Sequence, residues 1–88
     1  MIDKGRYRRR TPDRQYQGKM REALKARVVD VPARITRSEV EALGADIGLE
    51  DPVEATRLFG RLKGVSWRGE YVDSDGGGWT EARITNLN

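Results

Sequence analysis

Two helix starts lie only fifteen residues apart, and they constrain this chain more than any other feature. The first is a capping box, in which Thr36 as N-cap and Glu39 at the third helical position satisfy each other's backbone amides. The second places Asp51 at the N-cap and Pro52 at the first helical position. Gly48 is a left-handed stop for the first of these helices. About three residues therefore separate the two helices, which is the spacing of a helix-turn-helix.

Apolar residues at helical spacing support these two helices and predict another one before them. The earlier helix begins at Thr11 and Pro12 and ends near residues 28–30, because Pro32 disfavours a helical conformation at the residue before it. Gly64 ends the last helix. The predicted buried stripes are Tyr16, Met20, Ala23, Leu24 and Val28 in the first helix, Val40, Leu43 and Ile47 in the second, and Ala55, Leu58, Phe59 and Leu62 in the third.

Strand patterns occupy the rest of the chain. A short extended piece covers residues 33–35, and longer strand-like runs cover residues 65–72 and 79–87. Alternation places Val65, Trp67 and Tyr71 on one face of the first long run. The intervening residues 73–78 are rich in Asp and Gly and predict a turn. The two long runs are therefore expected to form a hairpin.

The resulting order is helix, short strand, helix, helix, strand, glycine loop and strand. This order resembles the winged-helix branch of the helix-turn-helix superfamily. The resemblance is carried by the capping segment at residues 35–40, the turn at 48–52 and the glycine loop at 76–78, and it covers about residues 12–87. It implies an α+β winged-helix domain over residues 12–88, and the sequence before it, residues 1–11, is expected to be a flexible basic arm. The resemblance is one of architecture and points to no particular family.

The residue types argue against an enzyme. The 88 residues include no Cys and no His, which excludes disulfides, thiolate nucleophiles, zinc fingers and the commonest general base. The glycine loop has neither the length of a calcium-binding EF-hand nor the Lys-Ser/Thr of a phosphate-binding loop. We expect no catalysis, no metal, no cofactor and no small-molecule substrate. No apolar run reaches the length of a membrane span, and a cytoplasmic protein is expected.

Charge is distributed unevenly along the chain. The formal net charge is +3, but residues 1–30 carry ten Lys and Arg against four Asp and Glu, whereas residues 31–88 carry seven against ten. Such asymmetry is typical of an arm that binds a polyanion. The alternative interpretation is a solubilising tail.

The winged-helix resemblance implies that the third helix enters the major groove of DNA and that the wing reaches the phosphates. The chain is then expected to be a small prokaryotic or phage transcriptional regulator or accessory factor that binds duplex DNA. The arginines of the third helix are alternatively an ordinary solvated face paired with Glu54. The predicted DNA-binding residues are Arg6, Arg8, Arg9 and Arg10 in the arm, Thr56, Arg57, Arg61 and Lys63 on and after the third helix, and Arg68, Gly76, Gly77 and Gly78 in the hairpin.

Two other functions remain open at this level. Glu50, Asp51 and Glu54 crowd the start of the third helix and would repel phosphates, although the same residues favour a helix N-terminus. This acidic start favours a protein-binding winged-helix module that docks on or inhibits a larger complex. A third possibility is an RNA-binding module that uses the arginine-rich arm. Trp79, next to the glycine loop, either packs on the hairpin or offers a surface to a partner.

Overall fold

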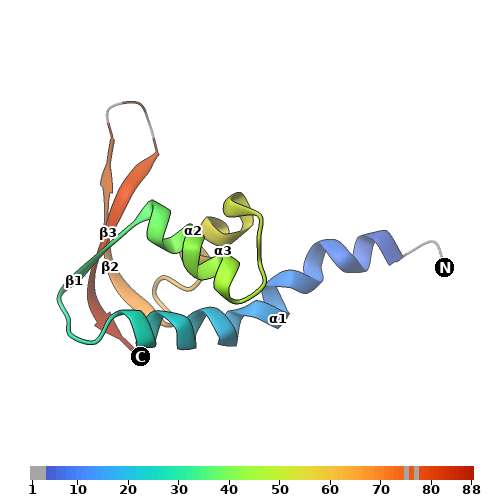
Figure 1. The fold of residues 1–88 in the computed structure, drawn as a ribbon, viewed down its shortest axis with the longest axis horizontal. Coiled ribbons are helices and arrows are strands. Elements are labelled where there is room, and N and C mark those ends of the chain that lie inside the picture. Colours follow the sequence, from blue (N-terminus) through green and yellow to red (C-terminus); the bar gives the residue numbers. More distant parts are fainter. Residues whose placement is uncertain (1–3, 75, 77) are drawn as a thin grey trace.

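The computed structural model describes residues 4–74, 76 and 78–88, with side chains from residue 15 onward. Within these residues the chain is a mixed α+β protein with three helices and a three-stranded antiparallel sheet (Figure 1). The class and the order of elements agree with the sequence analysis and are compatible with a winged helix. The elements are α1 (Lys4–Arg27), β1 (Ala33–Thr36), α2 (Arg37–Asp46), α3 (Pro52–Arg61), β2 (Trp67–Asp73) and β3 (Trp79–Leu87).

Helix α1 begins seven residues before the predicted start at Thr11. Residues 4–11, which we expected to form a flexible arm, belong to this 24-residue helix. Arginine has a high intrinsic helix propensity, and four arginines among residues 6–10 outweigh the local capping signal at Thr11. Pro12 therefore lies inside the helix, where it has no amide hydrogen to donate to the preceding turn.

The starts of α2 and α3 are confirmed at the predicted residues. The Glu39 amide donates to Thr36 Oγ1 at 3.1 Å, and the Thr36 amide donates to Glu39 Oε1 at 2.8 Å. At α3, the Val53 amide donates to Asp51 Oδ1 at 2.9 Å. Gly48 between the helices has a φ of 96°, a left-handed conformation that favours glycine. Local capping thus fixes the turn between α2 and α3.

The sheet has the strand order β1-β3-β2, so β3 lies in the middle. A register shift between Arg68 and Gly69 brings β2 very close to β3. A Cβ atom at Gly69 would lie 1.8 Å from the Arg83 carbonyl oxygen, so a side chain does not fit there. The distal ends of β2 and β3 extend beyond the helices as a hairpin (Figure 1).

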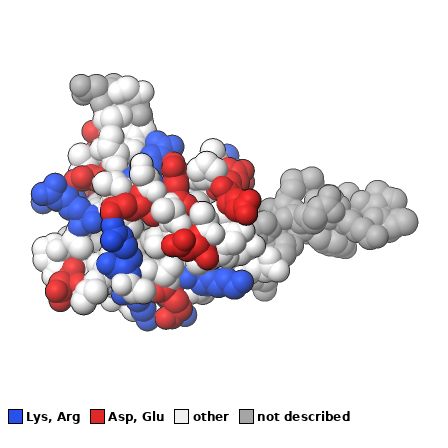
Figure 2. Space-filling view, viewed as in Figure 1, with Lys and Arg blue, Asp and Glu red and all other residues white. Residues whose placement is uncertain are grey.

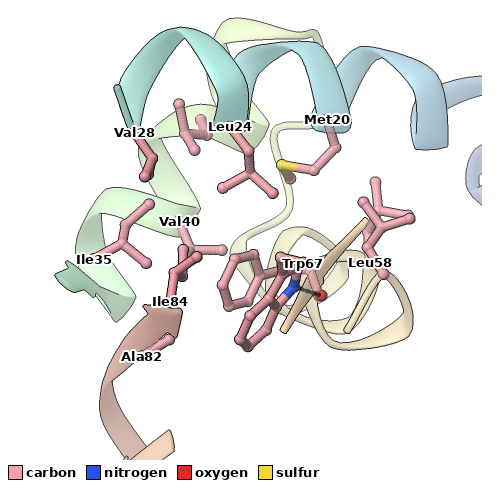
Figure 3. Packing of buried hydrophobic residues seen from close by; sticks show 12 residues of the cluster. Met20, Leu24, Val28, Ile35, Val40, Leu58, Trp67, Ala82 and Ile84 are labelled. Atoms are coloured by element: carbon pink, nitrogen blue, oxygen red, sulfur yellow. Dashed lines mark hydrogen bonds between the residues drawn. The ribbon is translucent and has the colours of Figure 1, made fainter. Parts of the chain in front are cut away.

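The hydrophobic core lies between the sheet and the helices, which sit to one side of it (Figure 1). Trp67 is its largest member and is fully buried. Its indole Nε1 donates to the Phe59 carbonyl oxygen at 2.9 Å, which satisfies its polar atom inside the core (Figure 3). Met20 and Leu24 point from α1 toward the same region (Figure 3). The predicted stripes of α2 and α3 face this core, with Ile47 half-buried at its margin.

The predicted position of Val65 is wrong. Its side chain is 64% exposed and belongs to the turn that follows α3, not to the buried face of a strand. The Leu62 carbonyl oxygen accepts hydrogen bonds from the amides of Val65 and Ser66 at 3.0 and 2.8 Å, so the backbone is still turning there. The strand begins only at Trp67.

Candidate nucleic-acid interface

Helix α3 presents part of the predicted basic set to solvent. Arg57 and Arg61 are exposed and lie four residues apart, so they share one side of the helix. Arg57 Nη1 lies 3.7 Å from Glu54 Oε2, an exposed ion pair that contributes little to stability. The Thr56 hydroxyl donates to the Val53 carbonyl oxygen at 3.0 Å. Thr56 therefore already uses its hydrogen-bond donor within the helix.

Lys63 follows the end of α3 and is also exposed. Its Nζ lies 5.9 Å from the centroid of the Trp67 ring, within the range of a cation–π contact. Lys63 is thus close in sequence to Arg57 and Arg61 and continues their charge beyond the helix.

Arg68, the arginine predicted in the hairpin, lies on the side of the sheet away from α3. Trp67 and Tyr71 face the helices, so the alternation of the strand puts Arg68 on the opposite, solvent face of the sheet. Gly76 and Gly78 are exposed near the tip, where the Ser74 amide donates to the Gly78 carbonyl oxygen at 3.0 Å. Gly77 lies outside the described residues.

The four arginines predicted for the arm lie within α1, but their side chains are outside the described part of the structure. These residues are Arg6, Arg8, Arg9 and Arg10.

A contact beside the turn of the hairpin was missed by the sequence analysis. Arg37, the first residue of α2, has its Cζ 5.7 Å from the centroid of the Trp79 ring. Its Nη1 also lies 3.2 Å from the position of a Cβ atom at Gly78. Trp79 is half-buried and packs on Phe59 and Tyr71, with ring centroids 5.8 and 4.9 Å apart. An exposed cation therefore joins an aromatic cluster at this edge of the molecule.

That contact depends on strand pairing, which is why the sequence did not indicate it. Thr36 pairs with Glu81 across β1 and β3, which carries the next residue of the chain, Arg37, towards the start of β3. The two partners are more than forty residues apart in sequence, and no local motif connects them.

The segment that carries α2, the turn after it and the start of α3 is strongly acidic. Residues 38–56 contain six Asp and Glu and no Lys or Arg. Three of these six acidic residues have a structural role: Glu39 and Asp51 cap helices, and Glu41 lies 3.9 Å from Arg37. Asp46 and Glu50 are exposed. Acidic side chains accordingly stand over the α2–α3 region in Figure 2, interspersed with basic ones.

No group of three or more acidic side chains among the residues that the structure describes converges to hold a metal ion. Burial raises the pKa of the Tyr71 phenol above its ordinary value, so this group stays neutral near pH 7. None of the described helices has the length and apolar character needed to cross a bilayer.

Comparisons with protein-family models, with curated proteins and with solved structures each found no match to this chain.

Proposed function

We propose that this chain is a DNA-binding protein with a winged-helix fold, acting as a small regulator or accessory factor. The order of elements and the β1-β3-β2 sheet with a protruding hairpin support the fold. The observation that carries the function is the separation of charge. Ten of the seventeen Lys and Arg residues lie in the first 30 residues, a concentration that attracts a polyanion.

A fluorescence anisotropy titration with labelled duplexes of mixed sequence tests this proposal. We expect binding whose log affinity falls linearly with the logarithm of salt concentration, because bound cations displace counterions from the phosphates. Absence of binding to any duplex at low salt would refute the proposal. Binding that does not weaken as salt rises would also contradict it, because it would not depend on phosphate contacts.

The acidic helix-turn-helix segment favours a second function, that of a module that binds another protein. Residues 38–56 contain six acidic residues and no Lys or Arg, and the exposed Asp46 and Glu50 among them are unfavourable next to a phosphate backbone. A stoichiometric protein complex that survives nuclease treatment and weakens in an Asp46→Asn, Glu50→Gln variant is the result expected for this alternative. A complex that disappears with nuclease supports the DNA-binding proposal instead.

A further inference from the structure

In the structure, residues 4–11 of the predicted basic arm are part of a single long helix. Helix α1 runs without interruption from Lys4 to Arg27. At 1.5 Å per residue, 24 residues span about 36 Å. In Figure 1 its N-terminal half extends beyond the body formed by the other elements. The basic residues of this segment are therefore fixed to a rod rather than distributed along a tether.

Nearly all the excess positive charge of the protein lies on this helix. Residues 4–27 carry ten Lys and Arg against two Asp and Glu, a net charge of +8. Residues 28–88 carry seven against eleven, a net charge of −4. The first turn of α1 contains no acidic residue, so the partial positive charge of the helix N-terminus adds to that of the side chains.

The C-terminal half of α1 anchors the rod and still leaves cations available. Met20 and Leu24 are fully buried, which fixes one side of the helix against the core. Arg21 and Lys25 are exposed and lie four residues apart on a flank of the helix, about 100° around its axis from these two. Arg21 Nε lies 3.9 Å from the carboxylate of its neighbour Glu22, an exposed pair. By contrast, Arg27 is paired with Glu39 of α2 and belongs to the helix–helix contact.

Helix α3 is less suited than α1 to bind duplex DNA. Its N-terminal end, which usually meets the bases in a winged helix, follows directly on Glu50 and Asp51. Its exposed Arg57 lies beside Glu54 in an ion pair. Phosphates that approach this end meet negative charge first, whereas phosphates that approach α1 meet positive charge along its length.

We propose that α1, and not α3, is the element that enters duplex DNA, as one continuous basic helix. This inference rests on the proposed function. An α-helix with its side chains is about 10–12 Å across, and the major groove is about 12 Å wide, so the two fit. The protruding half of α1 can enter the groove, while the acidic body, which packs on the other half, lies outside it.

Two matched double variants distinguish the contribution of α1 to DNA binding from that of α3. One is Arg21→Gln with Lys25→Gln, and the other is Arg57→Gln with Arg61→Gln; each removes two exposed charges four residues apart. For the α1 variant we expect a Kd for duplex DNA raised roughly tenfold or more near 0.1 M salt, and a salt slope reduced by about 0.9 per lost phosphate contact. The α3 variant should change the Kd by less than about threefold. Circular dichroism confirms that both remain folded.

The opposite ranking of these variants, with the larger loss in α3, overturns the inference and leaves the DNA-binding proposal standing. A wild-type protein that binds no duplex defeats both. Equal affinity for a single-stranded RNA of the same length overturns the assignment of duplex DNA as the ligand. The three outcomes are distinguishable in one set of titrations.

A second pair of variants tests whether the helix must be continuous. Gln15 and Gln17 are exposed and uncharged, and they lie between the protruding and the anchored halves of α1. Replacing both with Gly weakens the helix, and replacing both with Ala strengthens it, while every charge is kept. We expect the Gly variant to bind duplex DNA several-fold more weakly than the Ala variant. Equal affinities would mean that the basic segment acts as a flexible tether, which contradicts the inference.

Discussion

Gly44 lies where α2 packs against α3, and the two helices are too close there for any side chain larger than that of glycine. A Cβ atom at this position would lie 2.4 Å from Ala55 Cβ and 3.1 Å from the Leu49 carbonyl oxygen. Gly44→Ala therefore forces the two helices apart, and we expect it to reduce the free energy of unfolding by about 1–3 kcal/mol. Chemical denaturation measures this change.

Gly18 is the matched control. It also lies within a helix, but nothing stands within 4 Å of the position of its Cβ atom. Gly18→Ala should raise the free energy of unfolding by about 0.5–1 kcal/mol, because alanine loses less backbone entropy than glycine. If both substitutions stabilise the protein, the close crossing of α2 and α3 is wrong.

Tyr71 gives the protein a dependence on alkaline pH. Burial raises the pKa of its phenol in the folded state above the ordinary value of 10.0. The folded state therefore favours the neutral phenol, and its contribution to stability is complete below pH 10 and is lost as the pH rises through the folded pKa.

The corresponding measurement is the urea midpoint of the wild type and of Tyr71→Phe over about pH 9–11. The wild type should lose more stability than the variant over this range. Other groups that titrate there, including the lysines, are common to both proteins and cancel in the difference. Parallel curves for the two proteins would contradict the buried environment of the phenol.

The start of α2 depends on the capping box at Thr36. Thr36→Ala removes the acceptor for the Glu39 amide, and we expect it to cost about 1 kcal/mol of stability. Ser38 is exposed in the same turn, so Ser38→Ala serves as the control, with an expected change within about 0.5 kcal/mol. Equal losses from the two substitutions would show that the box contributes nothing.

At the level of elements, the sequence predicted what local chemistry decides. The starts of α2 and α3 follow from side chains within three residues of each cap, so they are readable in the sequence. The start of α1 was mispredicted because Thr11 and Pro12 imitate a cap, while the structure continues the helix back to Lys4. Val65 was assigned to a strand because alternation cannot distinguish the last turn after a helix from the first residue of a strand.

The candidate site was predictable only in part, for the same reason. The exposed Arg57, Arg61 and Lys63 follow from the apolar stripe of α3, since residues off that stripe face solvent. The contact between Arg37 and Trp79 depends on the pairing of β1 with β3. Pairing partners across a sheet are set by tertiary structure, which this single sequence did not reveal.

The molecule as a whole divides into a folded body and a projecting basic helix end. The described core residues contributed by α1 begin at Tyr16, which packs at the margin of the core. We therefore expect a protein that begins at Gln15 to fold, with a free energy of unfolding within about 0.5 kcal/mol of the full chain. The same protein should bind duplex DNA much more weakly, because six of the ten basic residues of α1 are removed.

Denaturation and anisotropy titration on the two proteins check both halves of this prediction. A protein that begins at Arg21 is the control, since it also lacks the buried Met20 and should be destabilised by several kcal/mol, of the order of 2–5. If the protein that begins at Gln15 fails to fold, the first fourteen residues belong to the folded body after all.

The placement of the two tryptophans gives the protein two separate optical probes. Trp67 is buried in the core with its indole nitrogen hydrogen-bonded to a carbonyl oxygen, whereas Trp79 is half-buried beside the cation of Arg37, next to the turn of the hairpin. An aqueous quencher such as acrylamide should reach Trp79 and spare Trp67. In a Trp79→Phe variant the emission reports global unfolding alone, and the difference from the wild type isolates events at the hairpin. Ligand docking there is thus readable from native fluorescence, without a label.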